Sequence, residues 1–371
     1  MIFLKSYLKN KYKLIIQIFF KFFYGLIEIA SNNEIKNALI IKNIKINENL
    51  YKFFSIKNCR LYTTSVHDQS IIVKNKLIEG PSFQLRVKKN DTLFARNNGN
   101  INENIVLKIG TPRILKKIKG KVFSLLEGGA AKTNYYHWLF EILPKLEILN
   151  RIEKIENIDY FLLPSTKMVH QVETFNLLNI PHKKLLDSNS YKHIKCDELY
   201  VVDHPFRLTN NTVYDTQNIP FWIFQWLRKN FLKFKSTKSF GEKIFIDRSK
   251  SISAYRDIKN KDEVYKIFKD NDFKFIRPEN YGFRDQISMF FSAKKVAGLH
   301  GAAFANICFC NPKAEIIEFK TAGTGMNTGN IALKNNLDYK GIVCEAINKI
   351  GGQQGKLIVP MNEIKNIFND I

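Results

Sequence analysis

Two arginines and a histidine stand where strands of a parallel sheet are expected to end. Arg248 comes at the end of the apolar stretch 243–247, and Arg256 lies eight residues later in a serine-rich loop. His300 follows the apolar stretch 295–298 and opens a His-Gly-Ala turn. Ligands of open α/β sheets bind at the carboxyl ends of the strands, and guanidinium groups bind phosphate oxygens in pairs. These residue types in these positions indicate a phosphate-bearing ligand.

The turn after His300 favours close approach of a ligand to the backbone. Gly301 and Ala302 are small, and the run 302–310 can form a helix whose N-terminus would attract an anion. The spacing is not that of a dinucleotide fingerprint. The alternative is a packed turn whose histidine only hydrogen-bonds a neighbour. Glu318 closes the next strand, where its carboxylate could accept hydrogen bonds from a ribose or sugar hydroxyl, or cap a loop.

His137 and Glu141 form a second pair with chemical potential. They lie four residues apart on the predicted helix 135–150, so both project from one face. A carboxylate can orient an imidazole that acts as a general base. The same pair could hold a metal ion, although no third ligand is evident, or make a structural hydrogen bond at a helix surface.

The elements that must position these residues alternate between strands and helices. In the second half of the chain, the pattern predicts a parallel, doubly wound sheet, with strands at 243–247, 273–276, 295–298 and 315–319 and helices at 261–271, 282–293 and 302–310. The first half shows the same alternation, with strands at 121–126, 159–163 and 198–203 and helices at 135–150, 168–178 and 218–234.

We therefore expect an α/β protein with two Rossmann-like domains that face a cleft. The polar segment 235–242 is the predicted linker. Three parts follow: a basic amphipathic helical segment at 1–32, an N-terminal α/β domain with a β-rich elaboration at 33–235, and a C-terminal Rossmann-like domain at 236–371. Residues 33–120 show short β-prone pieces and no evident chemistry.

The N-terminal segment predicts a helix at 14–30 with one narrow polar stripe formed by Gln17, Lys21, Tyr24 and Glu28. Several lysines precede it. A basic, very apolar helix suits the interface of an anionic membrane. Charged residues interrupt the apolar run, so a spanning helix is not expected. The alternative is a helix packed on the domain or on a partner subunit.

The overall charge favours anionic partners. The 371 residues carry a formal net charge of +24, with about four lysines for each arginine. The lysines are spread along the chain and no nucleic-acid motif appears, so a non-enzymatic nucleic-acid-binding protein is the alternative interpretation and nucleic acid is not the expected partner. Five cysteines without a C-x-x-C pair predict reduced thiols in a cytoplasmic protein.

The motifs together resemble glycosyltransferase family 61. The resemblance rests on Tyr-His-Trp-x-x-Glu-x-x-Pro at 136–144, Asp-Arg at 247–248 with Arg256, and Leu-His-Gly-Ala at 299–302 followed by Asn306 and Glu318. It covers about residues 120–320 in the order that the family has. The first 120 residues do not contribute to it.

The resemblance implies a GT-B-like, inverting and metal-independent enzyme that moves a sugar from a nucleotide sugar to a glycan or lipid-linked saccharide acceptor. In bacteria such enzymes act in capsule or lipopolysaccharide assembly. No cofactor is expected, and the donor, expected to be UDP-linked, is a substrate. The expected location is the cytoplasm, at the inner face of the cytoplasmic membrane. The donor would bind the second domain, at Arg248, Arg256, His300, Gly301, Ala302, Asn306 and Glu318. His137 would act as the base, supported by Glu141.

Overall fold

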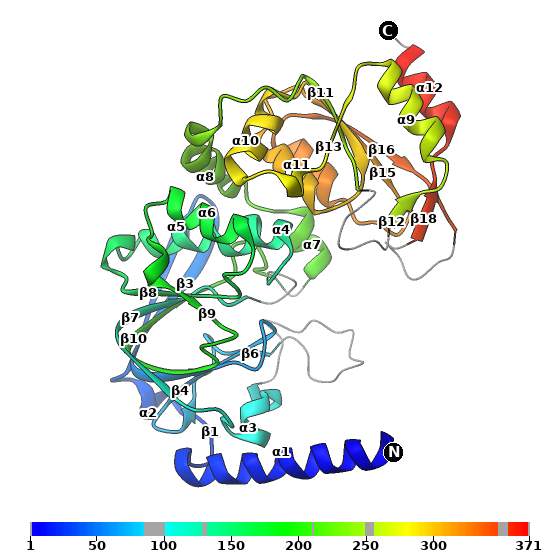
Figure 1. Cartoon of the computed structure of the whole chain (residues 1–371). Coiled ribbons are helices and arrows are strands. Elements are labelled where there is room, and N and C mark those ends of the chain that lie inside the picture. The colour runs from blue at the N-terminus through cyan, green and yellow to red at the C-terminus, as the bar shows by residue number, and fades with distance from the viewer. Residues whose placement is uncertain are drawn as a thin grey trace. The chain divides into compact units, whose positions relative to one another are not determined.

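The computed structural model describes residues 2–84, 101–127, 132–209, 211–248, 256–347 and 355–369. The chain folds into two compact units, Met1–Asp215 and Thr216–Ile371. Both mix helices with sheets (Figure 1), so the α/β class is confirmed. The GT-B-like cleft stays a prediction.

A ten-stranded sheet forms the centre of the first unit. Its long antiparallel pair β3–β10 joins two halves: mostly antiparallel strands from the first 84 residues on one side, and the parallel strands β7, β8 and β9 on the other. The strands are β1 (Glu28–Ile29), β2 (Leu39–Ile46), β3 (Asn49–Tyr62), β4 (Asp68–Val73), β5 (Lys76–Leu77), β6 (Phe83–Gln84), β7 (Lys116–Ser124), β8 (Tyr160–Leu163), β9 (Leu185–Asp187) and β10 (His193–Val202).

The N-terminal stretch thus supplies strands to the same sheet that carries the α/β rhythm. Buried apolar side chains from both halves of the sheet share one core cluster, among them Phe54, Ile71, Val122 and Leu162. The helices are α1 (Ile2–Tyr24), α2 (Asn32–Ile35), α3 (Ile105–Ile109), α4 (Tyr135–His137), α5 (Lys145–Asn150), α6 (Val169–Leu177) and, across the boundary between the units, α7 (Thr212–Gln217).

Two predicted helices of this unit differ in the structure. The N-terminal helix begins earlier than predicted and ends at Tyr24, because Gly25 adopts the left-handed conformation (φ 74°) in which helices commonly terminate; Glu28 then belongs to β1. The single helix predicted at 135–150 is α4, a π-helical turn (Trp138–Ile142) and α5. Pro144 has no N–H to continue the ladder.

The second unit contains a five-stranded parallel sheet in the order β13-β11-β14-β15-β16. The strands are β11 (Lys243–Ile246), β13 (Lys274–Ile276), β14 (Lys295–Leu299), β15 (Glu315–Lys320) and β16 (Asp338–Val343), and β12 (Arg256–Ile258), β17 (Glu345–Ile347) and β18 (Gly355–Ile358) form a small separate sheet. The predicted parallel sheet is confirmed, and β16 is an additional strand at its edge.

Helices cover both faces of this parallel sheet, which is why its strands are apolar on both sides. On one face, α9 (Lys261–Asp270) and α12 (Met361–Asn369) pack against apolar side chains of the strands. Figure 1 shows α10 (Phe283–Ser292) and α11 (Asn327–Lys334) on the other face. The predicted helix 302–310 is present as a 3₁₀ helix, Ala302–Phe309.

The helix α8 (Phe221–Phe231) belongs to the second unit, so the observed boundary precedes the predicted one at residue 235. The Arg228 guanidinium explains this assignment. It donates hydrogen bonds to the carbonyl oxygens of Cys308 and Cys310, at 2.8 and 2.7 Å, and so ties α8 to the 3₁₀ helix of the second unit.

Candidate functional site

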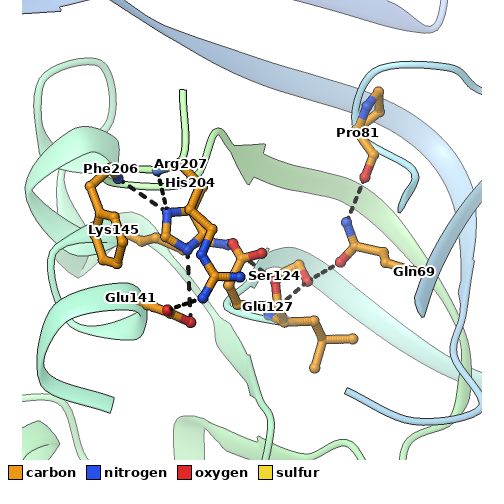
Figure 2. Close-up of polar contacts among 10 residues, drawn as sticks. Gln69, Pro81, Ser124, Glu127, Glu141, Lys145, His204, Phe206 and Arg207 are labelled. Carbon is orange, nitrogen blue, oxygen red and sulfur yellow. Dashed lines mark hydrogen bonds and ion pairs between the residues drawn. The ribbon is translucent and has the colours of Figure 1, made fainter. Parts of the chain in front are cut away.

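In the first unit, the Glu141 carboxylate is the centre of a buried ionic cluster (Figure 2). One oxygen, Oε1, lies 2.8 Å from Nδ1 of His137 and 2.7 Å from a guanidinium nitrogen of Arg207. The other oxygen lies 3.7 Å from Nε2 of His204. The predicted pair of His137 and Glu141 is therefore in contact, and two further residues join it.

The π-helical turn shapes this cluster. Leu143 donates its backbone N–H to the carbonyl oxygen of Trp138, five residues back, instead of four. The turn keeps Glu141 fully buried, while the His137 side chain retains 22% of its exposure. Of the two side chains, His137 is thus the one that a substrate can reach.

Glu141 stays ionised. Burial alone would raise the pKa of this carboxyl, but the charges of His137 and Arg207 outweigh burial and hold its pKa well below the ordinary value. An anionic carboxylate at Nδ1 orients the His137 ring and directs Nε2 away from Glu141. This arrangement is suited to a general base.

His204 and Arg207 come from the loop that follows β10. Nδ1 of His204 accepts hydrogen bonds from the backbone N–H groups of Phe206 and Arg207, at 3.1 and 2.9 Å. A ring nitrogen that accepts two hydrogen bonds carries no proton, so the proton of a neutral His204 resides on Nε2, which faces Glu141. The loop thereby supplies one hydrogen-bond donor to the carboxylate, Arg207, and places the His204 ring N–H beside it.

A cavity of about 650 Å³ adjoins this cluster, within the size range of small-ligand pockets. His204, Arg207 and Lys145 line it together with residues from the first 101 positions of the chain. Lys145 is paired with Glu127 at 2.7 Å, and both side chains are only 1% exposed. Lys145 also donates to the carbonyl oxygen of Leu126.

Figure 2 shows a second chain of polar contacts, which reaches two residues of the cavity lining, Gln69 and Pro81. Ser124 donates to the side-chain oxygen of Gln69, whose amide nitrogen donates to the Pro81 carbonyl oxygen at 2.7 Å. Apolar side chains such as Leu39 and Phe54 form other parts of the wall. A cavity with apolar walls and a polar end is suited to a ligand that presents both a ring face and hydroxyl groups.

In the second unit, the predicted donor residues gather where the strand order reverses. Numbered along the chain, the five strands have the order 2-1-3-4-5, and the reversal lies between β11 and β14. Ligands of doubly wound sheets bind at this switch point, beyond the carboxyl ends of the strands. Arg248 follows β11 and His300 follows β14, so both lie at the switch point.

Both predicted arginines converge on the same backbone atom. Arg248 and Arg256 donate to the carbonyl oxygen of His300, at 2.5 and 2.9 Å. Burial lowers the pKa of Arg248 to about 10, and the nearby charge of Arg256 adds to this effect. Two partly buried cations side by side form an electrostatic site for an anion.

Gly301 is required by this arrangement. A Cβ atom at this position would lie 1.6 Å from a guanidinium nitrogen of Arg248. Only a residue without a side chain therefore leaves Arg248 in its place against the His300 carbonyl.

Glu318 acts on His300. Its Oε1 lies 2.5 Å from Nδ1 of His300 and accepts from the Thr328 hydroxyl, while Oε2 accepts from Tyr339 at 2.7 Å. Burial raises the pKa of Glu318, but these hydrogen bonds and the His300 charge hold its pKa below the ordinary value. The carboxylate is fully buried, so in this structure it orients His300; its direct contact with a sugar hydroxyl stays a prediction.

The remaining predicted donor residues occupy different environments. Ala302 starts the 3₁₀ helix beside the arginine pair. Asn306 is fully buried and donates to the side-chain oxygen of Gln286 at 3.0 Å, which makes it a core residue of the same helix. Residues 249–255, between the two arginines, lie outside the described ranges.

Sequence reasoning missed Glu127, Lys145, His204 and Arg207. A buried Lys–Glu pair leaves no periodic signal, and His204 and Arg207 lie more than sixty residues from Glu141. The sequence signal that could have indicated His204 and Arg207 is their position directly after the predicted strand 198–203. Within the ranges that the structure describes, no group of three or more His, Cys, Asp or Glu side chains is arranged to hold a metal ion.

One comparison with known proteins matches a segment that contains most residues of both groups. A search of curated proteins finds no match for this chain. A family model does match: residues 135–317 correspond to the family described as Glycosyltransferase 61.

Proposed function

Because residues 135–317 belong to glycosyltransferase family 61, and the family makes the protein a glycosyltransferase, we propose that it transfers a sugar from a nucleotide-sugar donor to a glycan hydroxyl with inversion. The observation that carries the donor assignment is the convergence of Arg248 and Arg256 at the switch point of the second unit. Phosphate groups match this cationic site in charge and geometry.

On the donor side, the two arginines and His300 stabilise the diphosphate as it leaves. The bond between the anomeric carbon and the phosphate oxygen breaks, and negative charge accumulates on the phosphate. Preorganised donors aimed at such developing charge each contribute ~2.7–4 kcal/mol of barrier reduction. Glu318 keeps the His300 ring oriented, with Nε2 available to the ligand. Donor activation through these residues needs no metal ion, and UDP is our expected nucleotide.

On the acceptor side, His137 takes the proton. The acceptor hydroxyl oxygen attacks the anomeric carbon from the face opposite the leaving group, and its proton moves to Nε2 of His137. Glu141 holds the ring through Nδ1. General base catalysis of this kind contributes ~10²–10⁴-fold in rate.

The cavity of the first unit is our candidate for the acceptor saccharide. Its polar end adjoins the Glu141 cluster through His204 and Arg207, and its apolar walls suit sugar ring faces. We place the reaction in the assembly of a bacterial surface polysaccharide, such as capsule or lipopolysaccharide. In this setting, the basic composition suits an anionic membrane surface. Nothing in the family match supports the nucleic-acid-binding alternative.

We further propose a peripheral location at the inner face of the cytoplasmic membrane, with α1 as the attachment element. Within the described ranges, none of the helices combines the length and the apolar character needed to span a membrane. The attachment that we propose is to the membrane surface.

A calorimetric titration tests the donor assignment. The protein is titrated with UDP-, GDP- and CMP-sugars in the presence of EDTA. We expect one nucleotide class to bind, and Arg248→Ala to abolish binding. The matched control is Arg284→Ala, since Arg284 is an exposed arginine of the same unit that donates to a backbone carbonyl oxygen. Equal binding by both variants, or no binding to the folded wild type, would refute the assignment.

A further inference from the structure

The helix α1 lies on the first unit with Lys21 and Tyr24 of its polar stripe toward the body of the unit. Lys21 donates to the carbonyl oxygen of Lys108 at 2.8 Å, and the Tyr24 hydroxyl accepts from the backbone N–H of Leu115 at 3.0 Å. The Tyr24 ring also packs edge-on against His193. Two residues of the predicted stripe, Lys21 and Tyr24, therefore hold the helix on the protein.

The exposed surface of α1 and of the turn after it combines large apolar side chains with lysines of its first half, Lys9, Lys11 and Lys13. Phe22 is 85% exposed. Large apolar side chains that are more than half exposed run along this face, namely Tyr7, Leu8, Tyr12, Leu14, Ile15, Ile18, Phe19, Phe22, Phe23 and Leu26. A helix on a water-exposed surface normally has the reverse orientation. Many exposed large apolar side chains on one helix, with lysines beside them, indicate a surface that binds at a membrane interface.

A pocket of about 480 Å³ lies between α1 and the body of the first unit. Ile16 and Phe20 line it from the helix, and Arg113, Lys116 and Lys192 line it from the body. No aspartate or glutamate is among the residues that line it in the described part of the chain. The pocket thus combines apolar side chains on one wall with three cations on the other.

Lys192 and Arg113 lie close enough in this pocket for their charges to interact. Burial lowers the pKa of Lys192, the charges of Arg113 and Lys132 lower it further, and the charge of Asp68 opposes them. Burial also lowers the pKa of His193 to about 4, so this lining residue is neutral at physiological pH. An anion in the pocket would relieve the repulsion among the cations.

We propose that this pocket binds the phosphate headgroup of an anionic lipid, while the apolar face of α1 inserts into the membrane interface. The combination of a cationic pocket with exposed apolar side chains on α1 favours a lipid, because a free phosphate would account for the cations alone. The proposal rests on the membrane attachment proposed above and extends it by naming the class of lipid and the pocket residues that bind its headgroup. It does not depend on the donor assignment.

Vesicle flotation with the full chain tests the proposal. The vesicles contain phosphatidylcholine alone or phosphatidylcholine mixed with phosphatidylglycerol. We expect stronger binding to the mixed vesicles, decreasing as salt is added. Neutralising the pocket should lower binding to the mixed vesicles on the order of 100-fold, since each cation near an anionic surface changes partitioning about fivefold. This variant is Arg113→Gln/Lys116→Gln/Lys192→Gln.

A matched variant separates the pocket from net charge. Lys154→Gln/Lys167→Gln/Lys183→Gln removes the same charge from exposed lysines of the same unit that do not line the pocket, and we expect it to retain most of the binding. Phe22→Ser/Phe23→Ser should weaken binding to both vesicle types. Equal losses in the two triple variants, or equal binding to both vesicle types, would overturn the headgroup site.

Two further outcomes contradict the proposal. If inorganic phosphate displaces the protein from the mixed vesicles, and a neutral salt at the same ionic strength does not, the pocket binds free phosphate. If light scattering shows a dimer that Phe22→Ser/Phe23→Ser converts to a monomer while vesicle binding is absent, the apolar face binds a second copy. The calorimetric titration with nucleotide sugars is independent of either result.

Discussion

The substitution Glu141→Gln removes the charge at the centre of the first-unit cluster and preserves the shape of the side chain. Glu141 is fully buried and lies 2.8 Å from His137 and 2.7 Å from Arg207. Hydrogen bonds to charged groups contribute ~1.5–3 kcal/mol each, against ~0.5–1.5 for neutral ones. Weakening both contacts should therefore lower the free energy of unfolding by about 2–3 kcal/mol.

The same substitution should reduce catalysis more than stability. A neutral amide no longer stabilises a positively charged His137 ring or selects its orientation, so the proton transfer loses its positioned base. We expect the transfer rate to fall ~10²–10⁴-fold, the whole contribution of general base catalysis. Binding of the nucleotide sugar should be unchanged, because the donor residues belong to the second unit.

The assay combines initial transfer rates, calorimetric donor binding and urea unfolding on each variant. Glu147→Gln is the matched control, since Glu147 also pairs with a cation four residues on, Arg151, which is 52% exposed. An exposed pair contributes less than about 1 kcal/mol. The double variant His137→Gln/Glu141→Gln should be no slower than the worse single variant, because the two residues act as one unit.

Two results would refute this reasoning. A folded Glu141→Gln protein with nearly wild-type rates would show that the cluster is structural. Losses of rate that multiply in the double variant would show that His137 and Glu141 act separately.

Three more predictions follow from single contacts. Gly301→Ala should weaken nucleotide-sugar binding at least tenfold with little loss of stability, because the new methyl group displaces Arg248; calorimetry and urea unfolding measure both, and unchanged affinity would contradict the role of this arginine. Lys145→Met should lower the free energy of unfolding by ~3–5 kcal/mol, because Glu127 is left as a buried unpaired charge; Lys145→Met/Glu127→Leu should recover most of it, and no recovery would argue against charge burial as the cause. The pKa of His193 is about 4 in the folded protein, below its ordinary 6.5. The unfolded chain therefore binds the extra proton first as pH falls, and stability declines from pH 6.5 downward, by about 2 kcal/mol at pH 5. His193→Phe should remove this part of the slope in urea unfolding measured across that range, and an unchanged slope would rule it out.

Much of the second unit follows from the sequence. Its strands are short apolar runs and its helices are amphipathic, and both patterns are local, so the positions of β11, β13, β14 and β15 were predictable. Parallel strands then place Arg248 and His300 at one sheet edge by topology alone. The pair of His137 and Glu141 is likewise local, because helical spacing places both on one face.

The rest depends on contacts between residues that are distant in sequence. The predicted helix 135–150 contained no signal for its π-helical turn. The loop that brings His204 and Arg207 to Glu141 is positioned by β10, which pairs with β3 and with β7, both distant from it in sequence. The cavity is lined by residues from the first 101 positions, where the sequence showed no chemistry. The polar stripe of α1 was visible in the sequence, but whether it faces water or protein was not.

The sequence by itself thus determined the α/β class, the family resemblance and the two groups of residues that carry the proposed chemistry, because local periodicity and short motifs encode them. Only the tertiary structure decided which carboxylates orient which histidines, where the cavity lies and which face of α1 is exposed. Those features depend on burial and on pairing across the sheet. Their contacts join residues that are distant in sequence and meet only when the chain has folded.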